Sequence, residues 1–189
     1  MAKHRTRGFL VTGIFVARTG LPDTITQNNF NPVVQQQRPD AIGPYNAIYA
    51  TERTNVGNSI RYLAPANSAN FPLAPTGPFY TGAGANRRRV LPVSIGTLGR
   101  NTVRTPGEWS QDISIIREFR LKEKPRFQLR GEAFNVFNHT NFNGPDVGLN
   151  VIATTVNGQD AAVFNLPNFG LITSAKAPRF LQLVARIEF

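Results

Sequence analysis

The chain has 189 residues, a formal net charge of +10 and no cysteine. The lack of cysteine excludes an internal disulfide framework, a thiolate zinc site and an iron–sulfur cluster. Phe (14), Gly (16) and Pro (14) are plentiful and only 17% of residues are charged, which favours aromatic strands joined by Gly- and Pro-rich loops over a helical protein.

The positive charge does not gather into an obvious nucleic-acid-binding surface. The dense basic runs lie at residues 3–7 and 87–89, and the other basic residues are scattered along the chain. No RNP-like aromatic motif, zinc-finger spacing or heptad-bearing basic helix accompanies them. We therefore predict no nucleic-acid partner, and keep a basic nucleic-acid binder only as an alternative.

The first predicted element is a β-strand at residues 8–19, where apolar side chains occupy alternate positions. Residues 1–7 are basic and residues 8–17 are largely apolar, so residues 1–20 also resemble a secretory signal peptide, although no small-x-small cleavage site follows. The alternation favours the strand, and the signal peptide remains the alternative. The face predicted to be apolar holds Phe9, Val11, Gly13, Phe15 and Ala17.

Residues 21–107 are predicted to form a long irregular loop. The segment is rich in Asn, Gln, Gly and Pro, and proline cannot donate a hydrogen bond to a sheet. Two short runs, at 59–63 and 89–95, could add short strands within it.

The second and third predicted strands lie at residues 109–119 and 126–137 and are joined by the short turn 120–125. In both, polar or charged residues alternate with apolar ones over ten or more positions. The predicted apolar faces hold Trp109, Ile113, Ile115 and Phe119, and then Phe127, Leu129, Gly131 and Ala133; the polar faces hold Ser110, Asp112, Ser114 and Glu118, and then Arg126, Gln128, Arg130 and Glu132.

A second long loop is predicted at residues 138–178, followed by a fourth strand at residues 179–189. Within the loop, the pair Asn157-Gly158 between two β-prone runs is a strong hairpin signal. The fourth strand places Leu181, Leu183, Ala185, Ile187 and Phe189 opposite Gln182, Arg186 and Glu188.

Together these segments predict an all-β protein whose antiparallel, curved, open sheet is part of a transmembrane β-barrel with long irregular loops. A tilted strand needs about 9–11 residues to cross a bilayer, which the four segments supply. No apolar run approaches the roughly 18 residues of a membrane helix. An antiparallel sandwich with one solvated face also alternates, and is the alternative fold.

Three features favour the barrel over the sandwich. Charged residues occupy the polar faces, aromatic residues lie near the strand ends, and one short turn contrasts with two long loops. If the chain ends on the periplasmic side, the turn 120–125 is periplasmic and the loop 138–178 is extracellular. Outer-membrane barrels keep this arrangement.

Three stretches resemble the end of Oar-like TonB-dependent transporters. They are LGRNTVRTPG at 98–107 leading into the second strand, RGEAFNVFNHTNF at 130–142, and NFGLITSA at 168–175 continuing to Phe189. The resemblance is close over residues 98–189 and loose before them. It implies an outer-membrane receptor that binds a large ligand at its extracellular loops and passes it through the barrel under energy coupling from the inner membrane.

The resemblance also implies partners. A terminal phenylalanine after alternating apolar residues looks like the signal that barrel-assembly machinery recognises. Family members carry a signal peptide, an energy-coupling box and a plug domain ahead of some twenty strands, and none of these three preceding parts is visible here. Four or five strands are too few to close even a small barrel of about eight.

We therefore expect residues 1–189 to be one partial barrel domain, a fragment whose sheet has exposed edges at 8–19 and 179–189. Its predicted partners are outer-membrane lipid, the barrel-assembly machinery, an unknown extracellular ligand, and the remainder of the barrel and plug. The predicted location is the bacterial outer membrane.

The sequence offers no catalytic, cofactor-binding or metal-binding residues, so we predict that the protein is not an enzyme and has no cofactor. His4 and His139 lack further ligands at metal spacing. Glu118, Glu123, Asp112 and Glu132 are explained more simply by opposite-charge pairing with Arg126 or Arg130 than by acid–base chemistry. The glycine-rich run 82–86 lacks the Gly-Lys-Ser ending of a phosphate-binding loop.

The predicted function is a fragment of a TonB-dependent receptor or transporter, which takes up ligand across the outer membrane when intact. The main alternative is a soluble β-rich module that binds carbohydrate or another ligand. Its stacking platforms would be Trp109, Tyr45, Tyr49, Tyr62 and Tyr80.

Overall fold

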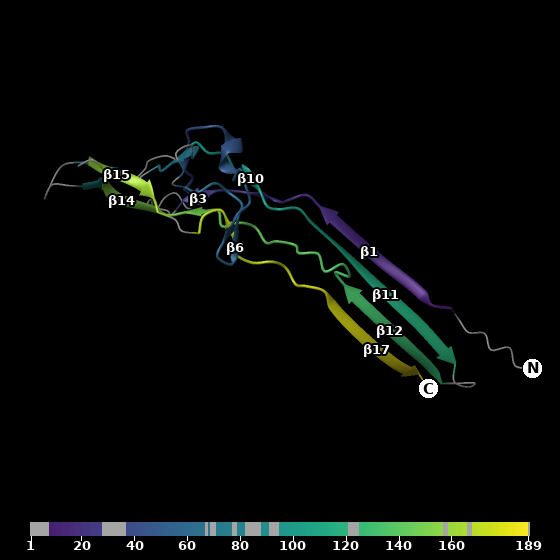
Figure 1. Cartoon of the computed structure of the whole chain (residues 1–189). Coiled ribbons are helices and arrows are strands. Elements are labelled where there is room, and N and C mark those ends of the chain that lie inside the picture. Colours follow the sequence, from purple (N-terminus) through teal and green to yellow (C-terminus); the bar gives the residue numbers. More distant parts are fainter. Residues whose placement is uncertain are drawn as a thin grey trace, which may run out of the picture. The chain divides into compact units, whose positions relative to one another are not determined.

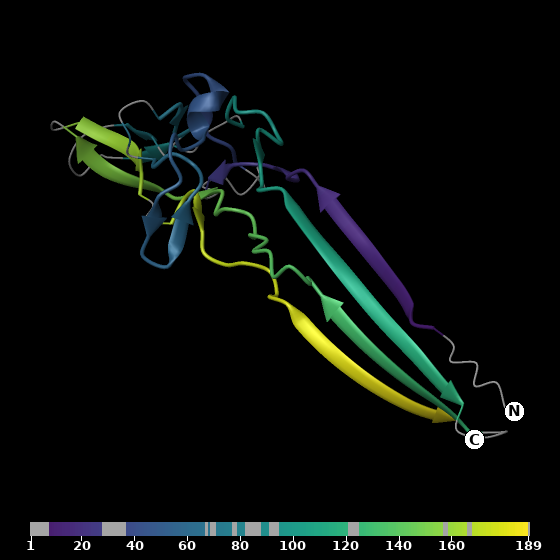
Figure 2. The same ribbon diagram turned by 45° about the vertical axis from the view of Figure 1, so that its right-hand side comes forward.

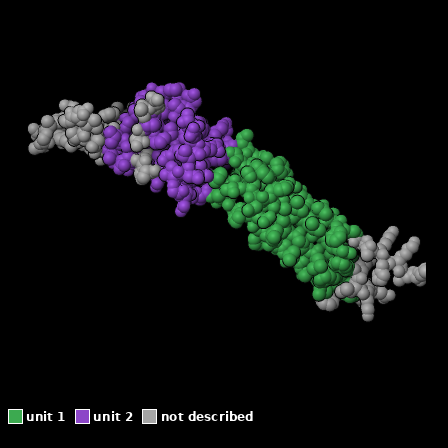
Figure 3. Space-filling view, viewed as in Figure 1, with its two compact units in different colours: residues 1–19, 107–142, 175–189 green, residues 20–106, 143–174 purple. Residues whose placement is uncertain are grey.

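The computed structural model describes residues 8–27, 37–66, 68, 71–76, 79–81, 88–90, 95–120, 125–156, 159–165 and 168–188. The chain divides into two compact units, coloured green and purple in Figure 3. Unit 1 comprises residues 1–19, 107–142 and 175–189, and unit 2 comprises residues 20–106 and 143–174.

Unit 1 is a single antiparallel sheet of four strands, β1 (Leu10–Arg18), β11 (Glu108–Arg120), β12 (Arg126–Phe134) and β17 (Phe180–Glu188). They pair in the order β1-β11-β12-β17 (Figure 1). Figure 2 shows the strands bending along their length. Among the described strands, β1 and β17 have a neighbour on one side only. The predicted curved, open antiparallel sheet is confirmed.

The third strand ends three residues earlier than expected. The sequence pattern extends to residue 137, but β12 ends at Phe134. Asn135 adopts a φ of 48°, which an extended strand does not tolerate, and its backbone N–H donates to the Asp112 carboxylate at 2.9 Å instead of to the sheet ladder. Alternation of side-chain character cannot reveal this left-handed residue.

Unit 2 consists of short paired segments. Its paired strands are β2 (Pro22–Asp23) with β10 (Val103–Arg104), β3 (Thr26–Gln27) with β13 (Gly148–Leu149), β4 (Asp40–Ala41) with β7 (Leu73–Ala74), β6 (Ser59–Arg61) with both β5 (Asn55–Val56) and β16 (Leu171–Ile172), β8 (Phe79–Thr81) with β9 (Arg88–Val90), and β14 (Val151–Val156) with β15 (Gln159–Phe164). The β3–β13 pair is parallel, and a single 3-10 turn, η1, spans Tyr45–Ile48.

The two long loops are therefore largely irregular, with short strands. The run 59–63 contains β6, and β9 begins the run that was expected at 89–95, although residues 91–94 lie outside the described part. The predicted hairpin is present as β14 paired with β15, and its turn residues 157 and 158 lie outside the described part. Phe189 and the glycine-rich run 82–86 also lie outside it.

Unit 2 holds a hydrophobic core that was not expected of loops. The fully buried side chains of this core come from segments far apart in the sequence: Ile25, Ile48, Leu63, Leu98, Val103 and Phe169. Burying apolar side chains of this size is worth about 1.5–3 kcal/mol each relative to exposure. The segments thus pack together as a unit in spite of their many prolines.

Gly170 brings two of these segments together. It has a φ of +74°, and a Cβ at this position would lie 2.6 Å from the Cβ of Leu63. The backbone amides of Tyr62 and Leu63 both donate to the Gly170 carbonyl, at 2.8 and 3.0 Å. Only glycine allows both the left-handed backbone and this approach.

Unit 1 has no comparable core. Every buried hydrophobic residue in the described part of the chain belongs to unit 2, whereas the apolar side chains of β1 and β17 are exposed. Leu183, for example, is 90% exposed. Among the described residues, no helix is long and apolar enough to cross a membrane.

Candidate membrane-spanning surface

The register of the sheet places the predicted apolar residues on one face. Val11 pairs with Ile115, which pairs with Gly131, which pairs with Leu183. Because side chains in one cross-strand row share a face, this row and its alternate neighbours form a continuous apolar surface. The surface, called the apolar face below, holds Val11, Gly13, Phe15, Ala17, Trp109, Ile113, Ile115, Phe119, Phe127, Leu129, Gly131, Ala133, Leu181, Leu183, Ala185 and Ile187, and the register places two polar residues, Gln111 and Arg117, on the same face.

One end of the apolar face carries an aromatic cluster, which we call the loop-end cluster: Phe15, Trp109, Phe137 and His139. Trp109 is at its centre, with ring centroids 6.2 Å from Phe15, 5.9 Å from Phe137 and 4.3 Å from the stacked His139. Both long loops of the chain start and finish at this end of the sheet, because β1 and β12 end here and β11 and β17 begin here.

The other end carries the turn-end cluster, which consists of Phe9, Arg117, Phe119 and Phe127. The ring centroids of Phe119 and Phe127 lie 6.0 Å apart. The Arg117 guanidinium carbon lies 4.7 Å from the ring centroid of Phe9 and 4.8 Å from that of Phe119.

The spacing of the two clusters matches the thickness of a membrane. Trp109 and Phe119 belong to the same strand and are ten residues apart. Ten residues of antiparallel strand rise about 34 Å, which corresponds to about 26 Å along the membrane normal at a tilt of about 40°. An outer-membrane barrel exposes an apolar band about 25 Å tall between two aromatic girdles. The apolar face has these proportions.

The opposite face carries the charges. Arg130 forms an ion pair with Glu132, Arg186 pairs with Glu188 at 2.8 Å, and the Gln128 amide donates to Glu118 at 3.3 Å. Apolar side chains are also present there, namely Leu10, Ile14, Val16, Ile116, Phe134, Phe180 and Val184. The sheet is therefore amphipathic, with one face suited to hydrocarbon and one that includes hydrated charges.

Comparison with known protein families agrees with this geometry. A family model of an outer membrane beta barrel domain matches residues 1–182. The chain belongs to the outer membrane β-barrel domain family. No curated protein and no solved structure matches it. The predicted location in the bacterial outer membrane is thus confirmed.

A barrel domain of this family is a non-enzymatic kind of fold. Within the described part of the chain, no three His, Asp or Glu side chains gather as a metal site would require. His139 stacks on Trp109, and His4 lies outside the described residues. The absence of catalysis and of a cofactor stays a prediction.

The acidic residues of the four-stranded sheet of unit 1, called the barrel sheet below, make structural contacts. Glu132 pairs with Arg130, as expected from opposite-charge pairing. Asp112 instead accepts a hydrogen bond from the Asn135 backbone, and Glu118 accepts one from Gln128. Glu123 lies outside the described residues.

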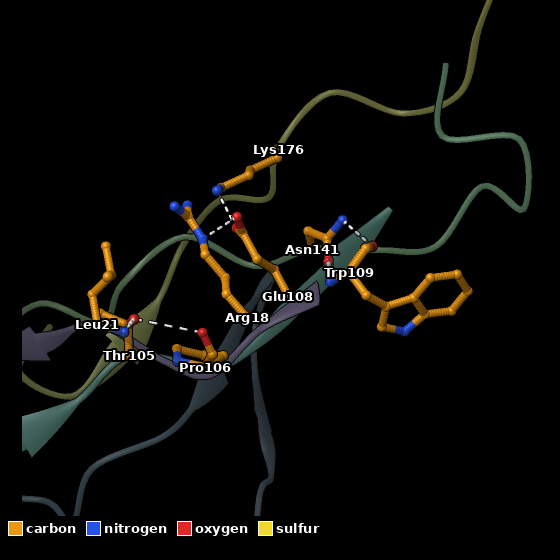
Figure 4. Close-up of polar contacts among 8 residues, drawn as sticks. All are labelled: Arg18, Leu21, Thr105, Pro106, Glu108, Trp109, Asn141 and Lys176. Atoms are coloured by element: carbon orange, nitrogen blue, oxygen red, sulfur yellow. Dashed lines mark hydrogen bonds and ion pairs between the residues drawn. The ribbon is translucent and has the colours of Figure 1, made fainter. Parts of the chain in front are cut away.

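At the loop end of the barrel sheet, Glu108 joins three segments. Its carboxylate forms ion pairs with Arg18 of β1 and with Lys176, which precedes β17 (Figure 4). The Glu108 side chain is 18% exposed, and those of Arg18 and Lys176 are 48% and 41% exposed. A charged bridge of this kind belongs at the membrane–water boundary, where its partners remain hydrated.

Asn141 completes the edge of β11 beyond the end of β12. Its Oδ1 accepts from the Trp109 backbone N–H at 3.0 Å, and its Nδ2 donates to the Trp109 carbonyl at 2.9 Å (Figure 4). The side-chain amide thus takes the place of a neighbouring strand. Unsatisfied backbone groups in lipid cost several kcal/mol, so such a substitute matters in a barrel.

Asn135 performs a similar task in the turn after β12. Its side chain accepts from the His139 N–H at 3.0 Å and donates to the His139 carbonyl at 2.9 Å. Asn138, whose φ is 52°, accepts a hydrogen bond from the Arg179 backbone at 3.0 Å. The asparagines of the family-like stretch 130–142 are therefore architectural, a role that sequence inspection did not assign.

Arg117 is the one charged residue in the described rows of the apolar face. A charged side chain on the lipid-facing side of a barrel costs about 2–4 kcal/mol at the midplane but about 0–1 kcal/mol near the interface. Arg117 lies three residues before the end of β11. This position is near the membrane interface, where the cost of the charge is about 0–1 kcal/mol. Sequence alternation did not single it out.

Unit 2 contains a cleft of about 910 Å³ lined in part by Tyr49, Glu52, Thr54 and Arg61. The Arg61 Nη1 donates to the Phe169 carbonyl at 2.6 Å, and burial lowers the pKa of this guanidinium below its usual value. Beside the cleft, Tyr62 packs edge-on against Tyr49, with ring centroids 5.9 Å apart.

The aromatic residues proposed as stacking platforms do not share one environment. Tyr45 is exposed, Tyr49 is half-buried and lines the cleft, and Tyr62 is only 9% exposed. These three belong to unit 2, whereas Trp109 belongs to unit 1, and Tyr80 lies in β8. Of the five, Tyr49 is placed to meet a ligand in the cleft.

Proposed function

We propose that the chain is part of a TonB-dependent receptor or transporter of the Oar-like kind, which takes up a ligand across the outer membrane when the barrel is complete. The observation that carries the proposal is the amphipathic sheet, in which β1 and β17 have a neighbour on one side only among the described strands. A transmembrane sheet must pair all of its edges. The resemblance of residues 98–189 to these transporters supports the finer assignment.

The sidedness follows the loop lengths. Both long loops leave the sheet at the loop-end cluster, and β11 and β12 are joined at the turn end by only five residues, 121–125. Barrels of this type keep short turns in the periplasm and long loops outside the cell. We assign unit 2 to the extracellular side on this basis, and the turn 120–125 to the periplasm.

The cleft of unit 2 supports ligand binding at the extracellular side. Its volume of about 910 Å³ lies within the range of small-molecule sites. Arg61 offers a partly desolvated cation and Tyr49 an aromatic ring on its wall. A ligand that carries both an anionic group and a flat or ring-shaped apolar part suits this lining.

The proposed partners follow from the surfaces. Lipid covers the apolar face, further barrel strands pair with β1 and β17, and a plug occupies the charged side of the closed barrel. The barrel-assembly machinery recognises the last strand, whose side chains at 181, 183, 185 and 187 are apolar. No nucleic acid is among the proposed partners.

A crosslinking experiment tests the pairing that the proposal requires. A photoreactive amino acid is placed at Thr12 on β1 or at Gln182 on β17 in the bacterium that makes the protein, and crosslinked partners are identified by mass spectrometry. The expected product joins each edge to barrel strands of a chain that carries a plug and a coupling box. Crosslinks confined to soluble proteins would refute the proposal.

An uptake experiment tests transport itself. Cells with and without the gene are compared for uptake of carboxylate-bearing oligosaccharides and peptides, before and after a protonophore removes the inner-membrane energy source. Uptake that needs both the gene and the proton gradient is expected. Energy-independent uptake would favour a simple pore.

The soluble-module and nucleic-acid alternatives are separated by two simple measurements. A barrel component partitions with membranes and needs detergent, whereas a soluble binding module remains monodisperse without it. Nucleic-acid affinity would fall steeply with the logarithm of salt concentration. We expect membrane partition and no such affinity.

A further inference from the structure

Arg117 is a cation on a surface otherwise suited to hydrocarbon. It belongs to β11, and its cross-strand partner is Leu129. Among the residues that the structure describes, no carboxylate lies within ion-pair distance of its guanidinium. Its positive charge is therefore not neutralised by a carboxylate of the described residues.

Two aromatic rings lie beside the guanidinium. Its central carbon lies 4.7 Å from the ring centroid of Phe9 and 4.8 Å from that of Phe119. Rings engage the flat faces of a guanidinium, which leaves the N–H groups at its edge available for an acceptor. Planar N–H pairs of this kind match the oxygens of a phosphate.

A hollow of about 510 Å³ lies beside Arg117 on the apolar face. Its floor is Gly131, where a Cβ would meet only the Leu183 side chain at 3.5 Å. Leu129, Ile115 and Leu183 contribute to its walls. The missing side chain at Gly131 thus leaves room between larger apolar neighbours for a segment of hydrocarbon chain.

We propose that this part of the barrel sheet is a binding site for one anionic phospholipid. The phosphate accepts hydrogen bonds from the edge of the Arg117 guanidinium, and an acyl chain lies in the hollow over Gly131. The position of Arg117 three residues from the end of β11 lets its long side chain reach the head-group level while its stem stays in hydrocarbon. The inference depends on the membrane location and not on the transport function.

The charge of the site selects the head group. An uncompensated guanidinium in a medium of low dielectric constant attracts a net negative charge more strongly than a zwitterion. We therefore expect phosphatidylglycerol to bind better than phosphatidylcholine, and diacylglycerol, which has no phosphate, to bind least. This order is a property of the unmodified chain and needs no variant.

The test uses the full chain folded in detergent micelles and titrated with each of the three lipids, with bound lipid counted by native mass spectrometry. We expect phosphatidylglycerol to bind about tenfold more tightly than phosphatidylcholine. Arg117→Gln should remove this preference, and Arg117→Lys should retain part of it. Gly131→Ile should weaken both phospholipids because it fills the hollow.

Arg186→Gln is the matched control, since Arg186 is a cation of the same sheet on the charged face. It should leave the preference for phosphatidylglycerol unchanged. Equal binding of phosphatidylglycerol and phosphatidylcholine by the unmodified chain would overturn the proposal. So would an equal loss in the Arg186 variant, tight binding of glycerol phosphate without acyl chains, or a dimer that excludes lipid from the site.

Discussion

The side chain of Asn141 forms two hydrogen bonds with the backbone of Trp109, donating to its carbonyl at 2.9 Å and accepting from its amide at 3.0 Å. Asn141 is only 8% exposed. One side-chain amide thus supplies the ladder partner that β12 no longer offers at this position. It also holds the residue at the centre of the loop-end cluster.

Replacing Asn141 with alanine should destabilise the sheet. The change leaves the Trp109 amide and carbonyl without partners, and each unsatisfied buried group costs about 1–3 kcal/mol. We expect a loss of about 2–4 kcal/mol in the free energy of unfolding, measured by denaturant titration of the chain folded in detergent micelles.

Asn143→Ala is the control for this change. The Asn143 side chain donates one exposed hydrogen bond to Ser174, so its loss should cost less than about 1 kcal/mol. Equal losses for the two variants would show that Asn141 is not a substitute for a strand.

Glu108→Gln should weaken the loop end of the sheet in a salt-dependent way. The carboxylate pairs with both Arg18 and Lys176, and exposed ion pairs contribute about 0–1 kcal/mol each. We expect a loss of up to about 2 kcal/mol at low ionic strength, shrinking at about 1 M salt because the charges are screened.

The matched variant for Glu108 is Glu188→Gln. Among the described residues Glu188 pairs with Arg186 alone, and both side chains are about half exposed or more. Glu188→Gln should lower the free energy of unfolding by less than Glu108→Gln does at every salt concentration. A loss that does not change with salt would attribute the Glu108 effect to packing.

Gly170→Ala should destabilise unit 2 more than the same change at Gly57, the other described glycine with a positive φ. The added Cβ would lie 2.6 Å from the Leu63 Cβ, on a residue with a φ of +74°. Left-handed backbone alone costs a non-glycine residue about 1–2 kcal/mol, and the overlap adds to it. We expect a total loss above about 3 kcal/mol and faster proteolysis of unit 2.

Gly57→Ala separates the cost of the left-handed backbone from the cost of the steric overlap. Gly57 also has a positive φ, +59°, but a Cβ there would meet nothing within 4 Å. Its loss should stay near about 1–2 kcal/mol, the cost of the left-handed backbone. Similar losses at both sites would mean that the Leu63 segment moves to accept the methyl group.

Tyr62 should make the stability of unit 2 sensitive to alkali. Burial raises the pKa of its hydroxyl above the usual value of 10.0, Arg53 acts in the opposite direction, and Tyr49 adds to the rise. The unfolded chain then ionises first. The contribution of Tyr62 to stability is complete below about pH 10 and is lost as pH rises through the higher pKa of the folded state.

Denaturant titrations at pH 8 and at pH 11 measure this effect. Tyr62→Phe should lose less stability on going to pH 11 than the unmodified chain does. Tyr45→Phe, which changes an exposed ring, should behave like the unmodified chain. If Tyr62→Phe loses as much stability between pH 8 and pH 11 as the unmodified chain, other groups cause the alkaline destabilisation.

The four-stranded sheet could be predicted because the alternation of apolar and polar residues repeats along each of its strands. In the row Val11, Ile115, Gly131 and Leu183, each residue lies in a strand long enough for alternation to show. A strand with one face toward lipid and one charged face must alternate apolar and polar residues with a period of two. The all-β fold and the open sheet therefore followed from the sequence.

The interior of unit 2 was not predictable in the same way. Gly148–Leu149 pairs with Thr26–Gln27, and strands of two residues are too short to carry a period. Buried residues such as Ile25 and Phe169 stand alone among prolines and polar residues. Their meeting depends on long-range packing, which local patterns do not encode.

The architectural and lipid-contact residues were missed for a different reason. Asn141 matters because of the backbone that it meets, and Arg117 because of the two rings beside it. Asparagine and arginine are both common throughout this chain. Only the three-dimensional neighbours distinguish these two from the rest.

Among the described strands, β1 and β17 are hydrogen-bonded to a neighbour on one side only. The free side of each presents a row of backbone amides and carbonyls that water can satisfy and hydrocarbon cannot. Under the proposed function, a membrane-embedded form of this sheet therefore has further strands hydrogen-bonded along both margins.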